Sequence, residues 1–177
     1  MHIILLALGS NLGDRAENLA QARKLLSTTL TIQAVSPIYE TEPWGVVDQP
    51  YFLNQALLAK TNLAPEALLA LVKTTEAALG RDFTAPRYGP RIIDIDILGY
   101  DDLRLSAPHL YIPHHRLHER AFVLVPLNDI APDWVHPGLN LTVAQMLELV
   151  DTAGVEMWQP LKASNLPPHM ILDAYRL

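Results

Sequence analysis

The sequence contains no cysteine, which excludes disulfides, thiolate zinc sites and cysteine nucleophiles. Lysine and arginine together number only 13, and the net charge is −6, so the chain lacks the basic surface typical of nucleic-acid binding. No apolar run approaches the ~20 residues that span a bilayer. The short apolar N-terminus lacks the basic start of a signal peptide. We therefore expect a cytoplasmic protein, active as a monomer, that binds neither membranes nor nucleic acid.

The composition is that of a folded globular chain. Half of the 177 residues are hydrophobic and 18% are charged, which is unlike a disordered chain. This length is sufficient for one domain with a sizeable core. Because no linker or repeat divides the sequence, we expect a single domain over 1–177. The segment 151–177 has no clear period, and its role is unknown.

Spacing of the apolar residues predicts the order of the elements. It predicts helices over 13–30 and 65–79, with strands over 3–8, 31–40, 52–59 and 92–100. This β-α-β-β-α-β order predicts a ferredoxin-like α+β fold, in which an antiparallel sheet carries two helices on one face. The other face would be free to form a cleft. Beyond residue 105 we expect additions: a segment over 118–127 that is partly helical and then extended, and a short helix over 143–150.

Two carboxylates stand two positions apart in the last of these strands. Asp94 and Asp96 should point to the same face of the strand, with Cβ atoms roughly 7 Å apart, while Ile93, Ile95 and Ile97 pack on the other face. Like charges on a half-buried face favour a cation between them, and Mg²⁺ prefers such oxygen ligands. The alternative is a solvated strand face with surface ion pairs. The flanking isoleucines and upstream arginines argue against it.

The sequence also lacks the Walker phosphate loop, since no G-x-x-x-x-G-K-[ST] segment occurs. A nucleotide would therefore have to be bound by arginines and metal. Arg81, Arg87 and Arg91 precede the two aspartates, and guanidinium groups suit phosphate oxygens. The segment 81–91 could close over ATP. Residues 9–11 form a strand-to-helix turn, which either caps the helix or lies at the edge of a site.

Other polar residues admit more than one interpretation. His114 and His118 have the spacing of a zinc site, but a proline precedes them and no glutamate of the metalloprotease pattern lies between them. A phosphate-binding or carboxylate-orienting role for His114 is favoured instead. Phe52 and Asn54 share a strand face, where an aromatic ring beside an amide could bind a flat heterocycle.

Together these features resemble a known family, the 6-hydroxymethyl-7,8-dihydropterin pyrophosphokinases of folate biosynthesis. Four blocks carry the resemblance: 7–14 (ALGSNLGD); 36–54, with SPIYET at its start and DQPYFLN at its end; 80–96, which ends in RYGPRIIDID; and 112–127, with IPH at its start and ERAFVLVPL at its end.

The resemblance implies that pyrophosphate passes from ATP to the hydroxymethyl oxygen of a reduced pterin and that AMP is released. It implies two Mg²⁺ ions on Asp94 and Asp96, with Arg81 and Arg91 as catalytic residues. The implied ATP-binding residues are Glu76, Arg87, Tyr88, His114 and Arg120. The implied pterin-binding residues are Thr41, Pro43, Trp44, Phe52, Asn54 and Phe122.

Three positions depart from the family pattern. Phe52 stands where tyrosine is frequent, Tyr88 where tryptophan is frequent, and Phe83 where some members carry a further loop arginine. Two alternatives stay open at this point. One is a metal-dependent nucleotidyl- or glycosyltransferase, although its Gly-Ser turn should lie much closer to the aspartates. The other is a non-enzymatic ferredoxin-like module, which gives no role to the arginines and aromatic residues.

Overall fold

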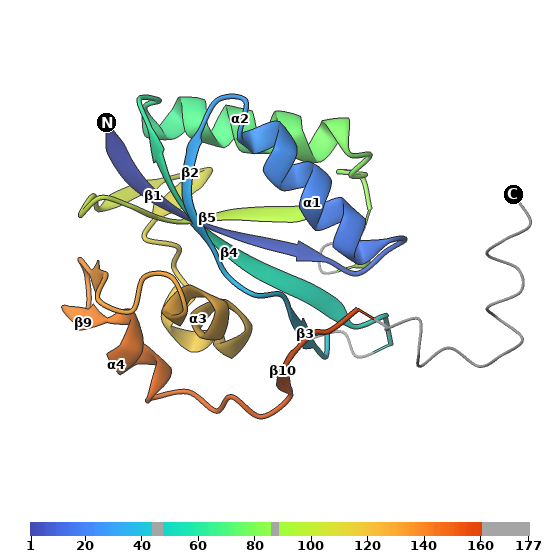
Figure 1. Ribbon diagram of the computed structural model, residues 1–177. Helices are drawn as coiled ribbons and strands as arrows, with labels where there is room; N and C mark the ends of the chain where they lie inside the picture. The colour runs from blue at the N-terminus through green and yellow to red at the C-terminus, as the bar shows by residue number, and fades with distance from the viewer. Residues whose placement is uncertain (44–47, 86–88, 161–177) are drawn as a thin grey trace, which may run out of the picture.

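The computed structural model describes residues 1–43, 48–85 and 89–160 (Figure 1). At its centre is an antiparallel sheet with strand order β10-β3-β4-β1-β5. Strand β2 pairs with residues 57–60 of β4. The strands are β1 (His2–Ser10), β2 (Thr31–Val35), β3 (Tyr39–Thr41), β4 (Phe52–Thr61), β5 (Asp94–Tyr100) and β10 (Val155–Met157). The mixed α/β class with an antiparallel sheet is thus confirmed.

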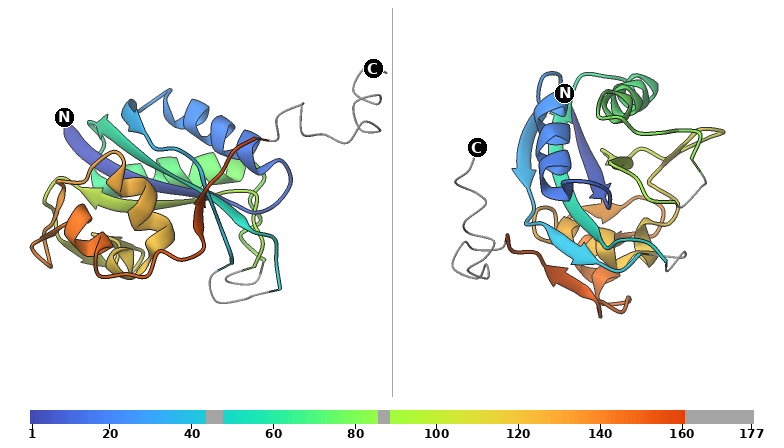
Figure 2. Two further views of the ribbon diagram at one scale, coloured as in Figure 1. Left: turned by 60° about the horizontal axis from the view of Figure 1, so that its bottom comes forward. Right: turned by 90° about the vertical axis from the view of Figure 1, so that its right-hand side faces the viewer.

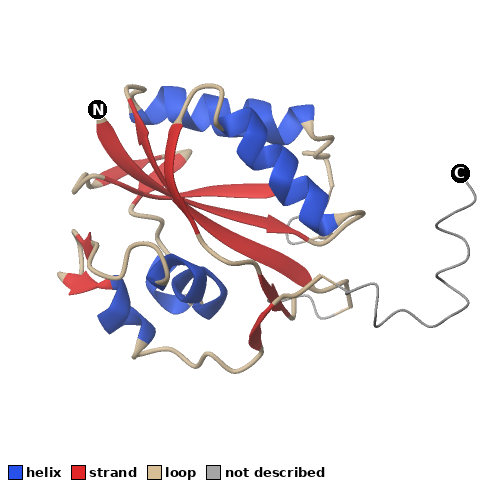
Figure 3. Cartoon of the chain, viewed as in Figure 1, coloured by secondary structure: helices blue, strands red, loops and turns tan. Residues whose placement is uncertain are grey.

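Helices cover both faces of this sheet (Figures 1 and 3). On one face lie α1 (Arg15–Leu26) and α2 (Pro65–Ala78), and on the other lie α3 (Ala121–Asn128) and α4 (Val143–Leu147). The two views in Figure 2 show the same separation. None of the helices in the described ranges has the length and apolarity needed to cross a bilayer.

Strand β1 is buried on both sides because successive side chains enter different cores. Ile4 and Leu6 pack with α1 and α2, whereas Leu5 packs with α3 and α4. This explains why the strand is a continuous apolar run rather than an alternating one. The part of the sheet that α3 and α4 leave uncovered borders the cavity described below.

Two small hairpins and one helical turn complete the described chain. They are β6 (Leu105–Ala107) with β7 (Leu110–Ile112), β8 (Val135–His136) with β9 (Leu141–Thr142), and the 3-10 turn Leu117–Glu119.

The expected element boundaries hold only in part. The helix expected over 13–30 is capped by Asp14 and ends at Leu26, and the segment expected as one strand over 31–40 is interrupted before β3. Gly80, with φ of 87°, follows α2 as expected for a terminating glycine. The helix expected over 143–150 ends at Leu147.

The extended end predicted for 118–127 is wrong, because this segment forms α3. Pro126 lies inside the helix and removes one backbone donor there. Val123, Leu124 and Leu127 are nevertheless fully or almost fully buried on the face that packs against the sheet, chiefly against β4. Tertiary burial of this apolar face outweighs the local cost of the proline.

Candidate active site

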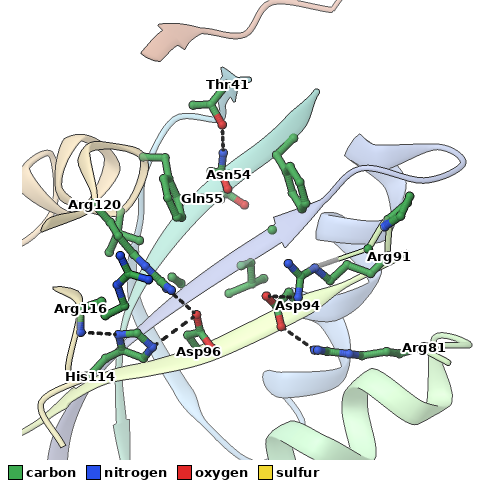
Figure 4. Close-up of a pocket in the computed structure, with 18 of the residues that line it drawn as sticks. Thr41, Asn54, Gln55, Arg81, Arg91, Asp94, Asp96, His114, Arg116 and Arg120 are labelled. Atoms are coloured by element: carbon green, nitrogen blue, oxygen red, sulfur yellow. Dashed lines mark hydrogen bonds and ion pairs between the residues drawn. The ribbon is translucent and has the colours of Figure 1, made fainter. Parts of the chain in front are cut away.

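A cavity of about 480 Å³ opens beside the ends of β1, β4 and β5 (Figure 4). It brings together ten of the predicted site residues: Thr41, Phe52, Asn54, Arg81, Arg91, Asp94, Asp96, His114, Arg120 and Phe122. Pro43 and Glu76 are not among the described residues that line it. Trp44, Arg87 and Tyr88 lie outside the described residues.

Asp94 and Asp96 point into this cavity from β5, as the alternation of the strand requires. The intervening Ile95 is 1% exposed and packs toward α1 and α2, together with Ile93 and Ile97. The predicted arrangement of this strand is therefore confirmed. It places two carboxylates on one wall of the cavity.

Arginines bracket Asp94 on both sides (Figure 4). Arg81 Nη1 donates to Asp94 Oδ1 at 2.5 Å, and Arg91 Nη1 lies 3.1 Å from Asp94 Oδ2. Asp94 stays 23% exposed, so incoming groups can reach it. Its carboxylate therefore serves as the anchor for two cationic side chains in the structure.

Asp96 has weaker partners. Arg120 Nη1 is 3.5 Å and His114 Nε2 is 3.9 Å from Asp96 Oδ2. Desolvation by burial, reinforced by the charge of Asp94, raises the pKa of Asp96 to about 6. The site thus holds one carboxylate that is harder to ionise than an ordinary aspartate.

His114 is a neutral imidazole at pH 7. Burial, with the nearby charge of Arg120 as the second cause, lowers its pKa to about 4. Its Nδ1 accepts a hydrogen bond from the backbone N–H of Arg116 at 3.2 Å, so the proton belongs on Nε2, which faces Asp96. His114 is therefore set to donate to a carboxylate or to a phosphate oxygen.

The donor set of the cavity fits a hard cation. Among the described residues no group of three or more His, Cys, Asp or Glu side chains is placed to hold a metal. Asp94 and Asp96 offer two carboxylates on one open wall, and this suits Mg²⁺, which binds through one or two carboxylates and takes its other ligands from water and phosphate. The raised pKa of Asp96 fits the same assignment.

Two phenyl rings and an amide form the other part of the cavity. Phe52 comes from β4 and Phe122 from α3, and an arginine lies over each ring: Arg91 Cζ is 5.6 Å from the centroid of Phe52, and Arg120 Cζ is 5.6 Å from that of Phe122. Asn54 Nδ2 donates to Thr41 Oγ1 at 2.8 Å. That bond orients the amide.

Phe83 also lines the cavity. It is 55% exposed, and Arg81 Cζ lies 5.3 Å from its ring centroid. At this position the chain thus presents an apolar ring that contacts a site arginine.

Asn11 holds three segments of the site together, a role that sequence reasoning missed. It is 1% exposed. Its Oδ1 accepts from the backbone N–H of Arg91 at 2.7 Å, and its Nδ2 donates to the Pro50 carbonyl and to Gln49 Oε1, both at 3.1 Å. The cap of α1 is Asp14 rather than Asn11. The turn at 9–11 therefore lies at the edge of the site.

Comparison with known proteins decides the family. Residues 5–132 match the family model described as 7,8-dihydro-6-hydroxymethylpterin-pyrophosphokinase (HPPK). The chain belongs to the HPPK family. It is 48% identical over 153 residues to the 2-amino-4-hydroxy-6-hydroxymethyldihydropteridine pyrophosphokinase of Methylorubrum extorquens, covering 85% of this chain and 95% of that protein. The resemblance inferred from the four sequence blocks is thus confirmed.

Longer relatives contain an HPPK region as one part. The mitochondrial folate synthesis bifunctional protein of Arabidopsis thaliana is 43% identical over 168 residues, which is 93% of this chain but 30% of that protein. The crystal structure of Plasmodium falciparum HPPK-DHPS with pteroate superposes with a TM-score of 0.68 at 20% identity, covering 84% of this chain and 42% of that one. The structural likeness supports the HPPK fold.

HPPK membership makes this chain a pyrophosphokinase of folate biosynthesis. The nucleotidyl- or glycosyltransferase and the non-enzymatic module are thereby set aside. Glu76 is the one described residue of the implied ATP set that is sealed off from the HPPK cavity: it is 0% exposed.

Proposed function

We propose that the cavity catalyses attack of the hydroxymethyl oxygen of 6-hydroxymethyl-7,8-dihydropterin on the β-phosphorus of ATP. A new P–O bond forms to the pterin, and the hydroxyl proton is released to solvent. The bond from the β-phosphorus to the α,β-bridging oxygen breaks, and AMP leaves with that oxygen. The observation that carries this proposal is the convergence of two carboxylates, several cationic side chains and two phenyl rings in one cavity of an HPPK chain.

Asp94 and Asp96 are the residues that would hold Mg²⁺, and we propose two ions. The metal, when bound, neutralises phosphate charge and makes the hydroxymethyl oxygen more acidic. Asp94 would then have to exchange its contacts with Arg81 and Arg91, which engage the same carboxylate oxygens. The guanidinium groups of Arg81 and Arg91 would in that case be available to bind the charge of the transferring phosphates.

His114 and Arg120 lie beside Asp96, whereas Arg81 and Arg91 lie beside Asp94. The neutral imidazole donates from Nε2, and the guanidinium is charged at every physiological pH. We assign both to ATP phosphates. Arg87 and Tyr88, outside the described residues, keep their predicted role in ATP binding.

The pterin ring is proposed to stack between Phe52 and Phe122. Because Asn54 Nδ2 already donates to Thr41, its Oδ1 faces the cavity as an acceptor for the N–H groups of the pterin edge. Backbone groups near Thr41, Pro43 and Trp44 would read the rest of that edge, although Trp44 lies outside the described residues.

The proposed reaction has a direct test. Incubating the protein with ATP, Mg²⁺ and 6-hydroxymethyl-7,8-dihydropterin should give AMP and a pterin diphosphate in equal amounts. The nucleotide products are separated by ion-exchange chromatography. Formation of ADP, or turnover that does not depend on the pterin, would contradict the proposal.

Gly9 provides a test of the pterin side of the cavity. It pairs with Asn54 in the sheet, and a Cβ at this position would lie 3.3 Å from Asn54 Oδ1 and 3.7 Å from the Phe52 ring. We expect Gly9→Ala to raise the KM for the pterin about tenfold, the scale of one lost hydrogen bond to the amide. The KM for ATP should stay unchanged. Equal effects on both substrates would argue against this placement of the pterin.

Asp96 gives a pH-dependent prediction for the protein without metal. Its pKa of about 6 lies above the ordinary carboxyl value, so the folded state binds this proton more tightly than the unfolded state. Its contribution to stability is therefore greatest below the ordinary value and is lost as the pH rises through about 6. Urea unfolding in EDTA at pH 5 and pH 7 should show this loss, and Asp96→Asn should lack it. An identical pH dependence in Asp96→Asn would refute the raised pKa of Asp96.

One further proposal concerns the arrangement of the sheet. We propose that the order β5-β1-β4 with β2 and β3, and with α1 and α2 on one face, is a ferredoxin-like arrangement. The cytoplasmic location, the monomeric state and the single domain over 1–177 stay predictions from the sequence.

A further inference from the structure

The strand that carries Thr41 is held to α3 by a side-chain hydrogen bond. Tyr39, two residues before Thr41 on β3, is 7% exposed, and its hydroxyl donates to Asp129 Oδ2 at 2.8 Å. Asp129 is the C-cap residue of α3. Neither Tyr39 nor Asp129 is among the residues that line the cavity. The bond therefore acts on the site from outside.

Each partner of this bond lies on the same short element as a residue that lines the cavity. On β3, Tyr39 and Thr41 share one face, and Thr41 accepts the bond that orients Asn54. On α3, Asp129 caps one end and Phe122 lies near the other, about 10 Å away along the axis. The bond thus joins the strand of the amide group to the helix of the phenyl ring.

The contacts around β3 show what the Tyr39–Asp129 hydrogen bond adds. β3 is only three residues long, paired with β4 on one edge and with the C-terminal strand β10 on the other. α3 packs mainly on β4 and also contacts both β3 and β10 (Figure 1). Sheet pairing fixes β3 relative to Phe52 and Asn54 on β4. The hydrogen bond from Tyr39 supplies a fixed point between β3 and α3.

We propose that Tyr39 is a positioning residue for the pterin: its hydrogen bond to Asp129 sets the separation between the Asn54–Thr41 pair and the face of Phe122. This inference rests on the proposed function, because it assigns both groups to the pterin. A flat ring can stack on Phe122 and meet the Asn54 amide at the same time only when their separation is fixed. ATP, bound at the arginines and carboxylates, does not depend on it.

The burial and charge of the pair agree with this role. Burial, followed by the hydrogen bond and charge of Asp129, raises the pKa of Tyr39 to about 12, so the hydroxyl remains a donor at all working pH values. Asp129 is exposed and can be hydrated when the bond is lost. Removing the hydroxyl should therefore loosen the β3–α3 link without burying an unpaired charge.

The chain offers a matched control for Tyr39→Phe. Tyr100 on β5 is 5% exposed, and its hydroxyl donates to the Leu63 carbonyl at 2.9 Å. Tyr100 does not line the cavity either. Tyr100→Phe thus removes a comparable tyrosine hydrogen bond that joins no pterin-binding elements.

The test measures the KM for each substrate, kcat and Tm. It compares the wild-type protein with four single variants and one double variant. We expect Tyr39→Phe and Asp129→Ala to raise the KM for the pterin about fivefold, the scale of one net hydrogen bond, with kcat and the KM for ATP within twofold of wild type. Asp129→Asn keeps an acceptor and should remain close to wild type. Tyr100→Phe should lower Tm without changing the KM for the pterin.

The double variant Tyr39→Phe with Asp129→Ala should be no worse than either single variant, because both remove the same bond. Unchanged pterin KM in Tyr39→Phe, or an equal increase in Tyr100→Phe, would overturn the inference while the wild-type reaction stands. A parallel rise in the KM for ATP would overturn it too. Absence of pterin-dependent turnover in the wild-type protein would overturn the proposed function itself.

Discussion

Replacing Asp94 or Asp96 with alanine is expected to abolish turnover while the fold survives. Each carboxylate is one of two oxygen ligands that the described chain offers to Mg²⁺ on this wall, so its loss removes charge stabilisation that no neighbour replaces. We expect kcat to fall at least about 10³-fold, the scale of losing a preorganised electrostatic contact in a closed site. The measurement is pterin-dependent AMP formation over a range of Mg²⁺ concentrations.

The two variants should remain folded because neither side chain belongs to the core. The Asp94 and Asp96 side chains are 23% and 33% exposed, and alanine creates no buried cavity at either position. Asp102→Asn, in the exposed turn after β5, is a control for the loss of one negative charge. Near-full Mg²⁺-dependent activity in either alanine variant would disprove the metal assignment. Excess Mg²⁺ should not restore the activity.

Local patterns were sufficient to predict the carboxylate wall. Alternation along a strand is a property of the backbone, so Asp94 and Asp96 had to share a face once the isoleucines entered the core. The same reasoning applied to Phe52 and Asn54 on β4. Residues on one strand can be placed relative to each other without any knowledge of the rest of the fold.

The contacts that organise the site are non-local, and the sequence did not predict them. Asn11 bonds to a residue 80 positions away in the chain, and Tyr39 to one 90 positions away. The helix α3 was predicted in part as extended, and Val123, Val125 and Pro126 weaken its local helical signal. Its helical form depends on burial against the sheet, chiefly against β4, which only the folded chain provides.

Glu76→Ala is expected to lower the free energy of unfolding by about 3 kcal/mol, the scale of breaking a buried ion pair. The Glu76 side chain is 0% exposed and satisfies three donors: Lys73 Nζ at 2.8 Å, the backbone N–H of Ile95 at 2.8 Å, and Arg81. Alanine leaves the Ile95 N–H buried without its acceptor and removes one of the two carboxylates that hold Arg81. Urea denaturation of the metal-free protein measures the loss.

Glu76→Gln distinguishes between two roles for this side chain: support of β5 and Arg81, or a direct contact with ATP. Glutamine can still accept from the backbone of Ile95, which lies between the two aspartates, but it removes the charge that pairs with Arg81. Glu66→Gln, exposed in the first turn of the same helix, is the matched charge control. If Glu76 acts by supporting β5 and Arg81, Glu76→Gln should be more stable than Glu76→Ala and should lower kcat more than it changes the KM for ATP. A selective rise in the KM for ATP would instead restore the direct ATP contact implied by the family resemblance. The full burial of this side chain behind β5 favours the supporting role.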